Sequence, residues 1–395
     1  MRKATLAFIF ALVAMDVLAL GIVIPVLPKL VESFVGGDTA RASRVFGAMN
    51  TVWGVMQFFS MPLLGMLSDR FGRRPVILAS CLGLGLDYFV MALAPNVEWL
   101  FAGRVISGIT AASISTGFAY ITDVTPPEKR AGAFGILGAA FGVGFVAGPA
   151  LGGVLGGIDP RLPFWAAGAL AIANACYGVF VLPESLPPQK RSPFHWRRAN
   201  PVGALQLLRS HRELFGLAGA LFLMNLAHMV LPSVAVLYMG YRYGWGPTRT
   251  GLVLAALGVC SMIVQGGLVR RIVPRIGERR GLAIGLLFGA VGFVWYGLAP
   301  SGTTFLMAIP VMSLWGFAVP SVQALMTKHV EVSEQGQLQG ANASLMALAG
   351  IFGPVLFTSL FATTLTTMPG TPFLLAALLL AAAMAIAWRA TMKTP

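Results

Sequence analysis

Apolar side chains dominate twelve stretches of the chain, and each stretch is about as long as a membrane-spanning helix. A helix needs about 20 apolar residues to cross the hydrocarbon core of a bilayer. The pattern predicts spans near residues 5–27, 45–67, 75–95, 98–122, 132–155, 162–183, 214–239, 249–269, 281–299, 303–327, 338–362 and 372–389. Longer connections are expected at 28–44 and 184–213. The sequence therefore predicts an all-α membrane protein with twelve transmembrane helices.

The connection 184–213 divides this pattern into two equal parts. It is rich in proline and cations and cannot span a membrane, so it predicts an N-terminal six-helix half (1–183), a cytoplasmic linker (184–213) and a C-terminal six-helix half (214–395). Gly72 and Gly277 follow spans 2 and 8, and Gly148 and Gly353 lie in spans 5 and 11; both pairs are 205 residues apart. A recurring offset indicates a duplicated unit. Two pseudo-symmetric bundles of this kind form a transporter architecture whose substrate site lies between them.

The composition excludes most other classes of protein. Hydrophobic residues make up 57% of the 395-residue chain and charged residues 11%, whereas about 25% is typical of soluble domains. Soluble enzymes, disordered regulators and disulfide scaffolds are thereby excluded, and the three distant cysteines fit buried apolar positions. The apolar run after the N-terminal cations carries Asp16 and leads into further spans, so we interpret it as an uncleaved first span.

The net charge of +14 is explained by where the cations lie. Of the 28 Lys and Arg residues, 21 fall on the side of the two termini and the central loop, 6 fall on the other side, and Arg104 lies within a span. Positive loops face the cytoplasm, so both termini and the loop 184–213 are expected there, with the lipid bilayer as partner. No nucleic-acid partner is needed to account for the charge.

The strongest motif, Gly65-Met-Leu-Ser-Asp69-Arg70-Phe-Gly72-Arg73-Arg74, connects spans 2 and 3. Glycine suits a tight turn, and the acid and the arginines can form ion pairs or meet helix ends. We interpret the motif as part of a cytoplasmic gate. Anchoring by positive charge alone is the alternative, although it would not require Asp69 or the paired glycines.

Span 5 carries small residues at every fourth position. Gly144, Gly148 and Gly152 form a smooth stripe along which another helix can approach closely or slide, and Pro149 permits a bend. Both a static packing face and a moving interface fit this pattern.

Few ionisable groups lie inside the spans, and such groups are functional by default because burying them is costly. Asp16 lies about eleven residues into span 1, roughly 16 Å deep, with no obvious cation at its depth. We interpret it as a proton or substrate site. Asp87 and Arg104 lie at similar depths and are expected to pair, for structure or for coupling. His228 is either a proton relay or a hydrogen-bonded structural residue.

Several amides inside the spans are candidates for a polar substrate cavity, although each can equally bridge helices. They are Gln57, Asn225, Gln265, Gln323 and Asn342. No lysine follows a glycine, so direct ATP drive through a phosphate-binding loop is excluded. No cluster of His, Cys and carboxylate suggests a metal or a covalent catalyst. We expect no enzyme activity, no cofactor and no metal.

Over essentially its whole length, the chain resembles the major facilitator superfamily. The motifs that carry the resemblance are the loop between spans 2 and 3, Leu100-x-x-Gly103-Arg104-x-x-x-Gly108 in span 4, and the glycines of span 5. More narrowly, it resembles the bacterial tetracycline/proton antiporters. The matching segments are Met15-Asp16 with Gly21-Ile-Val-Ile-Pro25, Leu86-Asp87-Tyr88, Ser107-Gly-Ile-Thr110, Phe180-Val-Leu-Pro-Glu184-Ser and Gly336-Gln-Leu-Gln-Gly340.

The resemblance implies a monomer of the bacterial inner membrane that confers tetracycline resistance. It would export an amphipathic drug-like small molecule in exchange for protons, by alternating access. The family also implies an Asp123–Arg73 pair within the cytoplasmic gate. Two positions depart from the family pattern: Ser261 stands where these exporters have a histidine, and Gly289 where they have an aspartate. A metabolite carrier of the same fold, or a uniporter without proton coupling, is therefore the alternative, and a membrane enzyme or a non-transporting receptor is a third.

Overall fold

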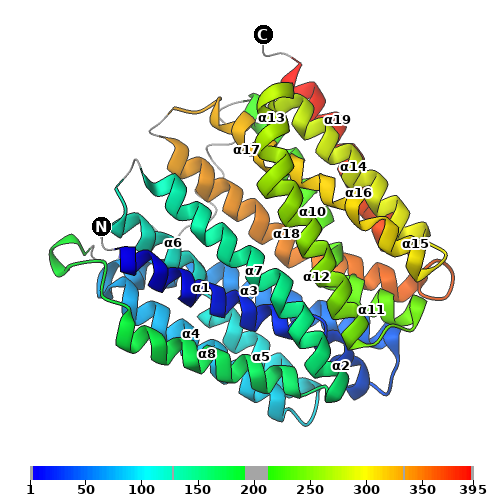
Figure 1. The fold of residues 1–395 in the computed structure, drawn as a ribbon. Helices are drawn as coiled ribbons and strands as arrows, with labels where there is room; N and C mark the ends of the chain where they lie inside the picture. The colour runs from blue at the N-terminus through cyan, green and yellow to red at the C-terminus, as the bar shows by residue number, and fades with distance from the viewer. Residues whose placement is uncertain (1–2, 127–128, 192–211, 332–333, 393–395) are drawn as a thin grey trace. The chain divides into compact units, whose positions relative to one another are not determined.

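In the part of the chain that the structure describes, helices are separated only by short turns and connections (Figure 1). A computed structural model describes residues 3–126, 129–191, 212–331 and 334–392. Within these residues, 12 helices or runs of helices are long and apolar enough to cross a membrane. They coincide with the twelve predicted spans, so the predicted fold class is confirmed. The linker expected at 184–213 lies mostly outside the described residues.

The helices follow one another along the chain with few intervening residues. The first half of the sequence contains α1 (Lys3–Val23), α2 (Leu27–Phe34), α3 (Thr39–Phe71), α4 (Arg73–Leu93), α5 (Val97–Thr110), α6 (Ser113–Val124), α7 (Arg130–Ile158), α8 (Leu162–Val181) and the short η2 (Pro188–Lys190). The second half contains α10 (Arg212–His228), α11 (Val230–Tyr243), α12 (Pro247–Ile263), η5 (Val264–Val269), α13 (Arg270–Ile276), α14 (Glu278–Leu298), α15 (Gly302–Met307), α16 (Ile309–Ser313), η6 (Leu314–Phe317), α17 (Ala318–Thr327), α18 (Gln335–Thr364) and α19 (Thr371–Thr391).

The expected long connection at 28–44 is wrong. Helix α2 extends to Phe34 and α3 begins at Thr39, so only a short turn remains. Lys29 and Glu32 form an ion pair of 2.7 Å one turn apart on α2, so charged residues are accommodated in the helix beyond the apolar run. Gly36 and Gly37, with φ of 75° and 80°, make the turn.

Within the described residues, five spans are interrupted, which a hydropathy pattern cannot show. Span 1 breaks at residues 24–26, between α1 and α2. Span 4 breaks at Ala111–Ala112 between α5 and α6, and span 7 breaks at Met229 between α10 and α11. Span 8 contains the π-helical segment η5, and span 10 contains the 3₁₀ segment η6. Interrupted helices in transporters expose backbone and side-chain groups to a binding site, so these breaks mark where functional side chains are to be sought.

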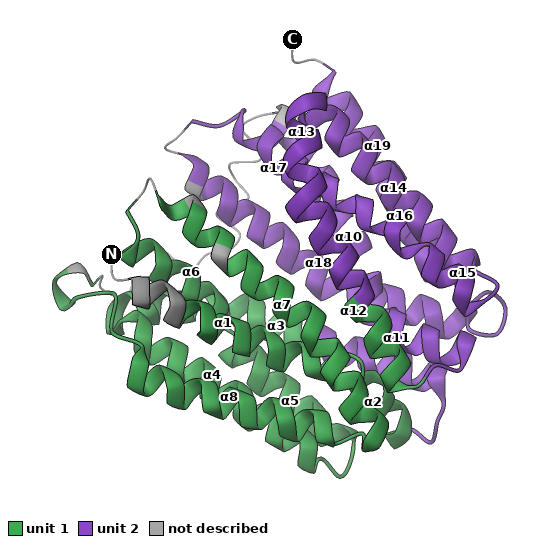
Figure 2. Cartoon of the chain, viewed as in Figure 1, with its two compact units in different colours: residues 1–34, 52–200, 246–255 green, residues 35–51, 201–245, 256–395 purple. Residues whose placement is uncertain are grey.

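The contacts divide the chain into two compact units (Figure 2). Unit 1 comprises residues 1–34, 52–200 and 246–255, and α1 lies at its centre, where Ile9, Leu12 and Val17 are buried with Tyr120 of α6. Unit 2 comprises residues 35–51, 201–245 and 256–395. Its aromatic core includes Tyr296 stacked on Phe305, with ring centroids 4.2 Å apart. These units are defined by contacts between residues and not by position in the sequence. The predicted division of the sequence at 183 and 214 therefore stays a prediction.

Candidate functional site

Asp16 is buried in the middle of α1, in unit 1, with 5% of its surface exposed. The hydroxyl of Ser113 donates a hydrogen bond of 2.5 Å to its carboxyl Oδ2. Ser113 is the first residue of α6, so the break at Ala111–Ala112 brings the positive end of a helix to this carboxyl. Among the described residues, no basic side chain lies within 4 Å of Asp16. The carboxyl is thus buried, with a neutral hydrogen-bond donor and no ion-pair partner among the described residues, and its role in proton transfer stays a prediction.

A second polar group, Asn174 of α8, binds α1 at Leu12, one helical turn before Asp16. Its amide nitrogen donates to the carbonyl of Leu12 at 2.9 Å and lies 3.8 Å from the sulfur of Cys81. Its amide oxygen is buried without a hydrogen-bond partner in the described part of the chain. Neither Ser113 nor Asn174 was a sequence candidate. The sequence could have indicated Asn174, because burying a lone amide in an apolar span costs free energy and such residues are therefore often functional.

Asp87 of α4 and Arg104 of α5 are brought near one another but do not form the expected direct pair. Asp87 is fully buried, and it lies so close to Gly103 that a side chain at residue 103 would collide with its carboxyl. Within the described residues, no cation lies within 4 Å of this carboxyl, and both of its oxygens lack a hydrogen-bond partner. The Nε of Arg104 is also buried without one. The coupling role of the pair stays a prediction.

In unit 2, His228 is the last residue of α10 and is exposed at the break before α11. Its ring lies 5.6 Å from that of Trp315, which belongs to η6. Trp315 in turn lies 5.4 Å from Phe293, and its indole Nε1 is buried without a partner among the described residues. The interrupted span 10 therefore places an aromatic side chain next to the candidate histidine.

In this structure Trp315 and Leu380 occupy the space that an acid at position 289 would need. A Cβ at Gly289 would lie 2.9 Å from Cγ of Trp315 and 2.8 Å from Cδ1 of Leu380. Since real Cβ atoms do not approach so closely, an aspartate at this position has no room. Ser261, the other departure from the family pattern, lies near the end of α12 and is half-buried.

The five candidate cavity amides lie in different places. Gln57, Asn225 and Gln323 are half-buried, and Gln57 belongs to unit 1. Gln265 is exposed on η5, and a Cβ at Gly316 would lie 3.1 Å from its Cγ, so it lies beside the segment that carries Trp315. Asn342 is 7% exposed, and within the described residues its amide atoms have no hydrogen-bond partner. Their role in binding substrate stays a prediction.

The motif between spans 2 and 3 forms a compact polar network centred on Arg73. Its guanidinium contacts Asp69 at 2.5 Å, Asp123 at 3.0 Å and the hydroxyl of Ser68 at 2.8 Å. The Asp123–Arg73 pair implied by the family is present in this structure, and Ser185 donates to the same Asp123 oxygen at 3.0 Å. Such a network can hold one state of a gate and open in another.

The remaining members of the motif lie around this network. Arg70 lies over the ring of Phe71 at 5.2 Å, and Arg74 donates to the carbonyl of Val179 in α8. Gly65 is half-buried, with no atom close to where a Cβ would lie. Gly72 has a φ of 110°, which favours glycine. The gating role of the motif stays a prediction.

Glu184, which follows α8, caps the first turn of α4. Its carboxylate accepts hydrogen bonds from the backbone N–H groups of Arg73 at 2.8 Å and Arg74 at 3.3 Å. A carboxylate at a helix N-terminus satisfies donors that have no partner within the helix and interacts favourably with the helix dipole. Gly72 also makes room for Glu184, since a Cβ there would lie 2.7 Å from the carboxyl carbon. Sequence matching found the segment of Glu184 but not this contact.

The carboxylate of Glu184 also accepts from the backbone N–H of Leu186 at 3.0 Å. Glu184→Gln is therefore expected to destabilise the protein by about 1 kcal/mol, because it removes the charge at the helix terminus and leaves one acceptor oxygen for three donors. The measurement is the thermal unfolding midpoint of the purified protein in detergent. Glu98→Gln is the matched control, because Glu98 lies in the first turn of α5 and is exposed. If the unfolding midpoint falls equally in both variants, the hydrogen bonds of Glu184 contribute no stability beyond that of any carboxylate near a helix N-terminus.

The glycine stripe of α7 faces α1. A Cβ at Gly144 would lie 2.7 Å from Cγ1 of Val17, and a Cβ at Gly148 would lie 2.6 Å from Cα of Gly21. At Gly152 a Cβ would collide with the carbonyl of Ile22. The two backbones thus touch along the helices, as small residues permit. Pro149 lies within this contact, and movement along it stays a prediction.

Two hydrogen bonds repeat the 205-residue offset. Thr248 of α12 donates to the carbonyl of Gly153 in α7 at 3.1 Å, within unit 1. Ser43 of α3 donates to the carbonyl of Thr358 in α18 at 2.9 Å, within unit 2. Residues 43 and 248 are 205 apart, as are 153 and 358. The internal repeat thus extends to equivalent contacts between helices.

Comparison with known proteins agrees with this architecture. The profile of the Major Facilitator Superfamily matches residues 6–354. The chain belongs to the Major Facilitator Superfamily. It is 38% identical to the class C tetracycline resistance protein of Escherichia coli, over 95% of this chain and 94% of the relative. It is 35% identical to the class G tetracycline resistance protein of Vibrio anguillarum, over 93% of each chain.

A solved structure shows the same superfamily fold. The human organic anion transporter MFSD10 matches with a TM-score of 0.74 at 24% identity, over 98% of this chain and 99% of the other. The predicted resemblance to the superfamily is confirmed, and so is the prediction that the protein is a transporter and not an enzyme. Membership of the Major Facilitator Superfamily implies a small-molecule substrate, and the twelve spans make it a multi-pass membrane protein.

Proposed function

We propose that this transporter exports an amphipathic drug-like compound of the tetracycline type in exchange for protons. Asp16 is the lead proton site, with Ser113 orienting its carboxyl. Asp87 and Arg104 form a second, coupled site, and His228 is a candidate relay. The amides predicted for the cavity contribute to substrate binding.

The observation that carries the proposal is the environment of Asp16. A carboxyl 5% exposed in the middle of a span, with a hydroxyl donor and no cation within 4 Å among the described residues, can change its protonation state as its surroundings change. Its helix also meets the glycine stripe of α7, with Gly21 one turn beyond Asp16. A rearrangement of α1 against α7 would therefore alter the setting of the carboxyl. Similarity to tetracycline resistance proteins over most of the chain supports the same class of substrate.

The proposal includes an orientation and a division into moving parts. The excess of cations on one side supports cytoplasmic termini in a bacterial inner membrane. Residues 1–183 and 214–395 act as the two halves of an alternating-access carrier, joined by the linker 184–213. The network of Arg73, Asp69 and Asp123 closes or opens the cytoplasmic side. The protein works as a monomer.

Flux in proteoliposomes tests the proposed function. We expect an imposed pH gradient to drive tetracycline, or a member of a panel of fluorescent drugs, across the membrane, and a protonophore to stop this flux. Proton movement in the opposite direction should appear on addition of the drug. If no panel member moves with the gradient, proton-coupled drug export is wrong.

A second candidate function is carriage of a small metabolite, with or without a proton. It is favoured by the filled space at Gly289, where Trp315 and Leu380 leave no room for an acid, and by the neutral Ser261. A panel of radiolabelled metabolites in the same proteoliposomes distinguishes it, because metabolite flux that ignores the drugs would favour this alternative.

A further inference from the structure

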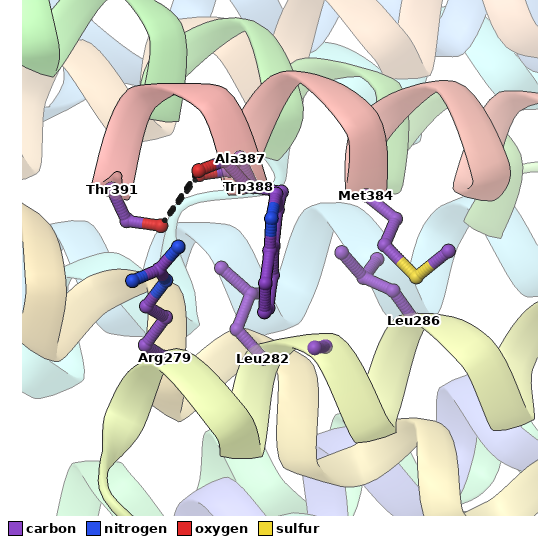
Figure 3. A pocket seen from close by; sticks show the side chains of 8 residues that line it. Arg279, Leu282, Leu286, Met384, Ala387, Trp388 and Thr391 are labelled. Atoms are coloured by element: carbon purple, nitrogen blue, oxygen red, sulfur yellow. Dashed lines mark hydrogen bonds between the residues drawn. The ribbon is translucent and has the colours of Figure 1, made fainter. Parts of the chain in front are cut away.

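A shallow recess lies between α14 and α19, at the end of these helices that carries their cations (Figure 3). Arg279 and Trp388 lie at its head, and Leu282, Leu286 and Met384 line the rest. The guanidinium carbon of Arg279 lies 4.3 Å from the centre of the Trp388 ring. Trp388 is 46% exposed, so the recess is open to the surroundings. Leu282 and Leu286 form the buried apolar floor of the recess. A cation over an exposed indole beside apolar side chains is a combination suited to the boundary between lipid headgroups and acyl chains.

The charge of Arg279 is not neutralised by the protein in this structure. Within the described residues, no acid lies within 4 Å of its guanidinium, and its Nε is buried without a hydrogen-bond partner. The neighbouring Glu278 pairs instead with Lys328 at 2.9 Å. Arg275, Arg280 and Arg389 are exposed near the same helix ends and add positive charge. The head of the recess therefore favours an anion.

The internal repeat supplies a comparison within the same chain. Arg74 lies 205 residues before Arg279 and also follows a glycine turn at the start of a helix. In the first half, the N–H groups of Arg73 and Arg74 bind the carboxylate of Glu184, which follows span 6. In the second half, the position 205 residues after Glu184 is occupied by Arg389, and residues 335–395 contain no Asp or Glu. Where the first half carries an anion, the equivalent position of the second half thus carries a cation.

We propose that this recess binds an anionic phospholipid. Arg279 binds the phosphate through its guanidinium, Trp388 supports the guanidinium and lies at headgroup level, and an acyl chain lies against the exposed Trp388 and the half-buried Met384. Basic pockets at the cytoplasmic ends of membrane helices bind such headgroups. This site is independent of the transported compound.

Native mass spectrometry of the full-length protein tests the site. The protein, released from detergent, is offered equal amounts of phosphatidylglycerol and phosphatidylcholine. We expect phosphatidylglycerol to bind preferentially, and Arg279→Gln to weaken its binding about fivefold, since one cation near an anionic lipid surface contributes about that factor. Arg271→Gln is the matched control, because Arg271 is an exposed cation of α13 that does not line the recess. Trp388→Leu should weaken binding as well, and it provides a second variant if Arg279→Gln fails to fold.

Two results would overturn the proposal. Equal losses in Arg279→Gln and Arg271→Gln would mean that phosphatidylglycerol binds to the overall positive charge and not to the recess. Displacement of phosphatidylglycerol by millimolar inorganic phosphate would mean that the site takes free anions and that the acyl chain contributes nothing. Retention of phosphatidylglycerol in the presence of phosphate, with loss in Arg279→Gln and Trp388→Leu, supports the lipid site.

Discussion

Asp16→Asn is expected to abolish flux driven by a pH gradient while leaving the protein folded. Asparagine has nearly the same shape as aspartate and can still accept the hydrogen bond from Ser113, but it cannot gain or lose a proton near neutral pH. The coupled step is therefore lost although the packing of α1 is kept. Gradient-driven flux in proteoliposomes should fall to the level seen with a protonophore, and drug binding to the detergent-purified protein should persist.

The control for this variant is Asp159→Asn. Asp159 is exposed after α7 and binds the backbone N–H of Arg161 at 2.7 Å, so it experiences the same chemical change outside the buried site. Ser113→Ala should give an intermediate result, with flux retained but with its pH dependence displaced, because the carboxyl loses its hydrogen-bond donor. Undiminished gradient-driven flux in Asp16→Asn would remove Asp16 from the proton pathway.

Gly148→Ala is expected to destabilise the protein clearly. The added methyl group would lie 2.6 Å from Cα of Gly21 and 2.8 Å from its carbonyl carbon, and these are backbone atoms that cannot rotate away. Helix α1 must therefore shift, at a cost of about 1–3 kcal/mol for an overpacked contact. The measurement is the thermal unfolding midpoint in detergent, together with flux in proteoliposomes.

Gly138→Ala is the matched control on the same helix. Nothing lies within 4 Å of a Cβ at Gly138, so this substitution adds a methyl group in open space and gains helix propensity. We expect Gly138→Ala to be at least as stable as the unsubstituted protein, and Gly148→Ala to be clearly less stable. Similar midpoints for the two variants would show that the close approach of α1 and α7 is not required for the fold.

The predicted spans and their order agree with the structure because the length of an apolar run is a local property of the sequence. The boundary at 28–44 failed for a local reason too: Lys29 and Glu32 pair on α2 and continue a helix past the apolar run. The break at Ala111–Ala112 has no comparable signal, because alanine favours helix and nothing nearby in the sequence indicates an interruption.

The sequence predicted the charged residues of the candidate site, but it did not predict which residues bind them. A carboxyl in an apolar span, such as Asp16, is conspicuous in a sequence. Its partner Ser113 is 97 residues away, and Glu184 is 111 residues from Arg73, so only the folded chain brings them together. The Asp123–Arg73 contact was available in advance only through family resemblance. The missing ion pair of Asp87 and Arg104 shows that equal depth in a membrane does not set side-chain geometry.

The contact between Gly289 and Trp315 has a consequence for how such carriers change over generations. An acid introduced at residue 289 alone would meet both the indole of Trp315 and the side chain of Leu380. We therefore expect the effect of an acid at residue 289 to depend on residues 315 and 380, since smaller side chains there would make room for it. A library that varies the three positions together is expected to reach charged variants that a library varying one position at a time misses.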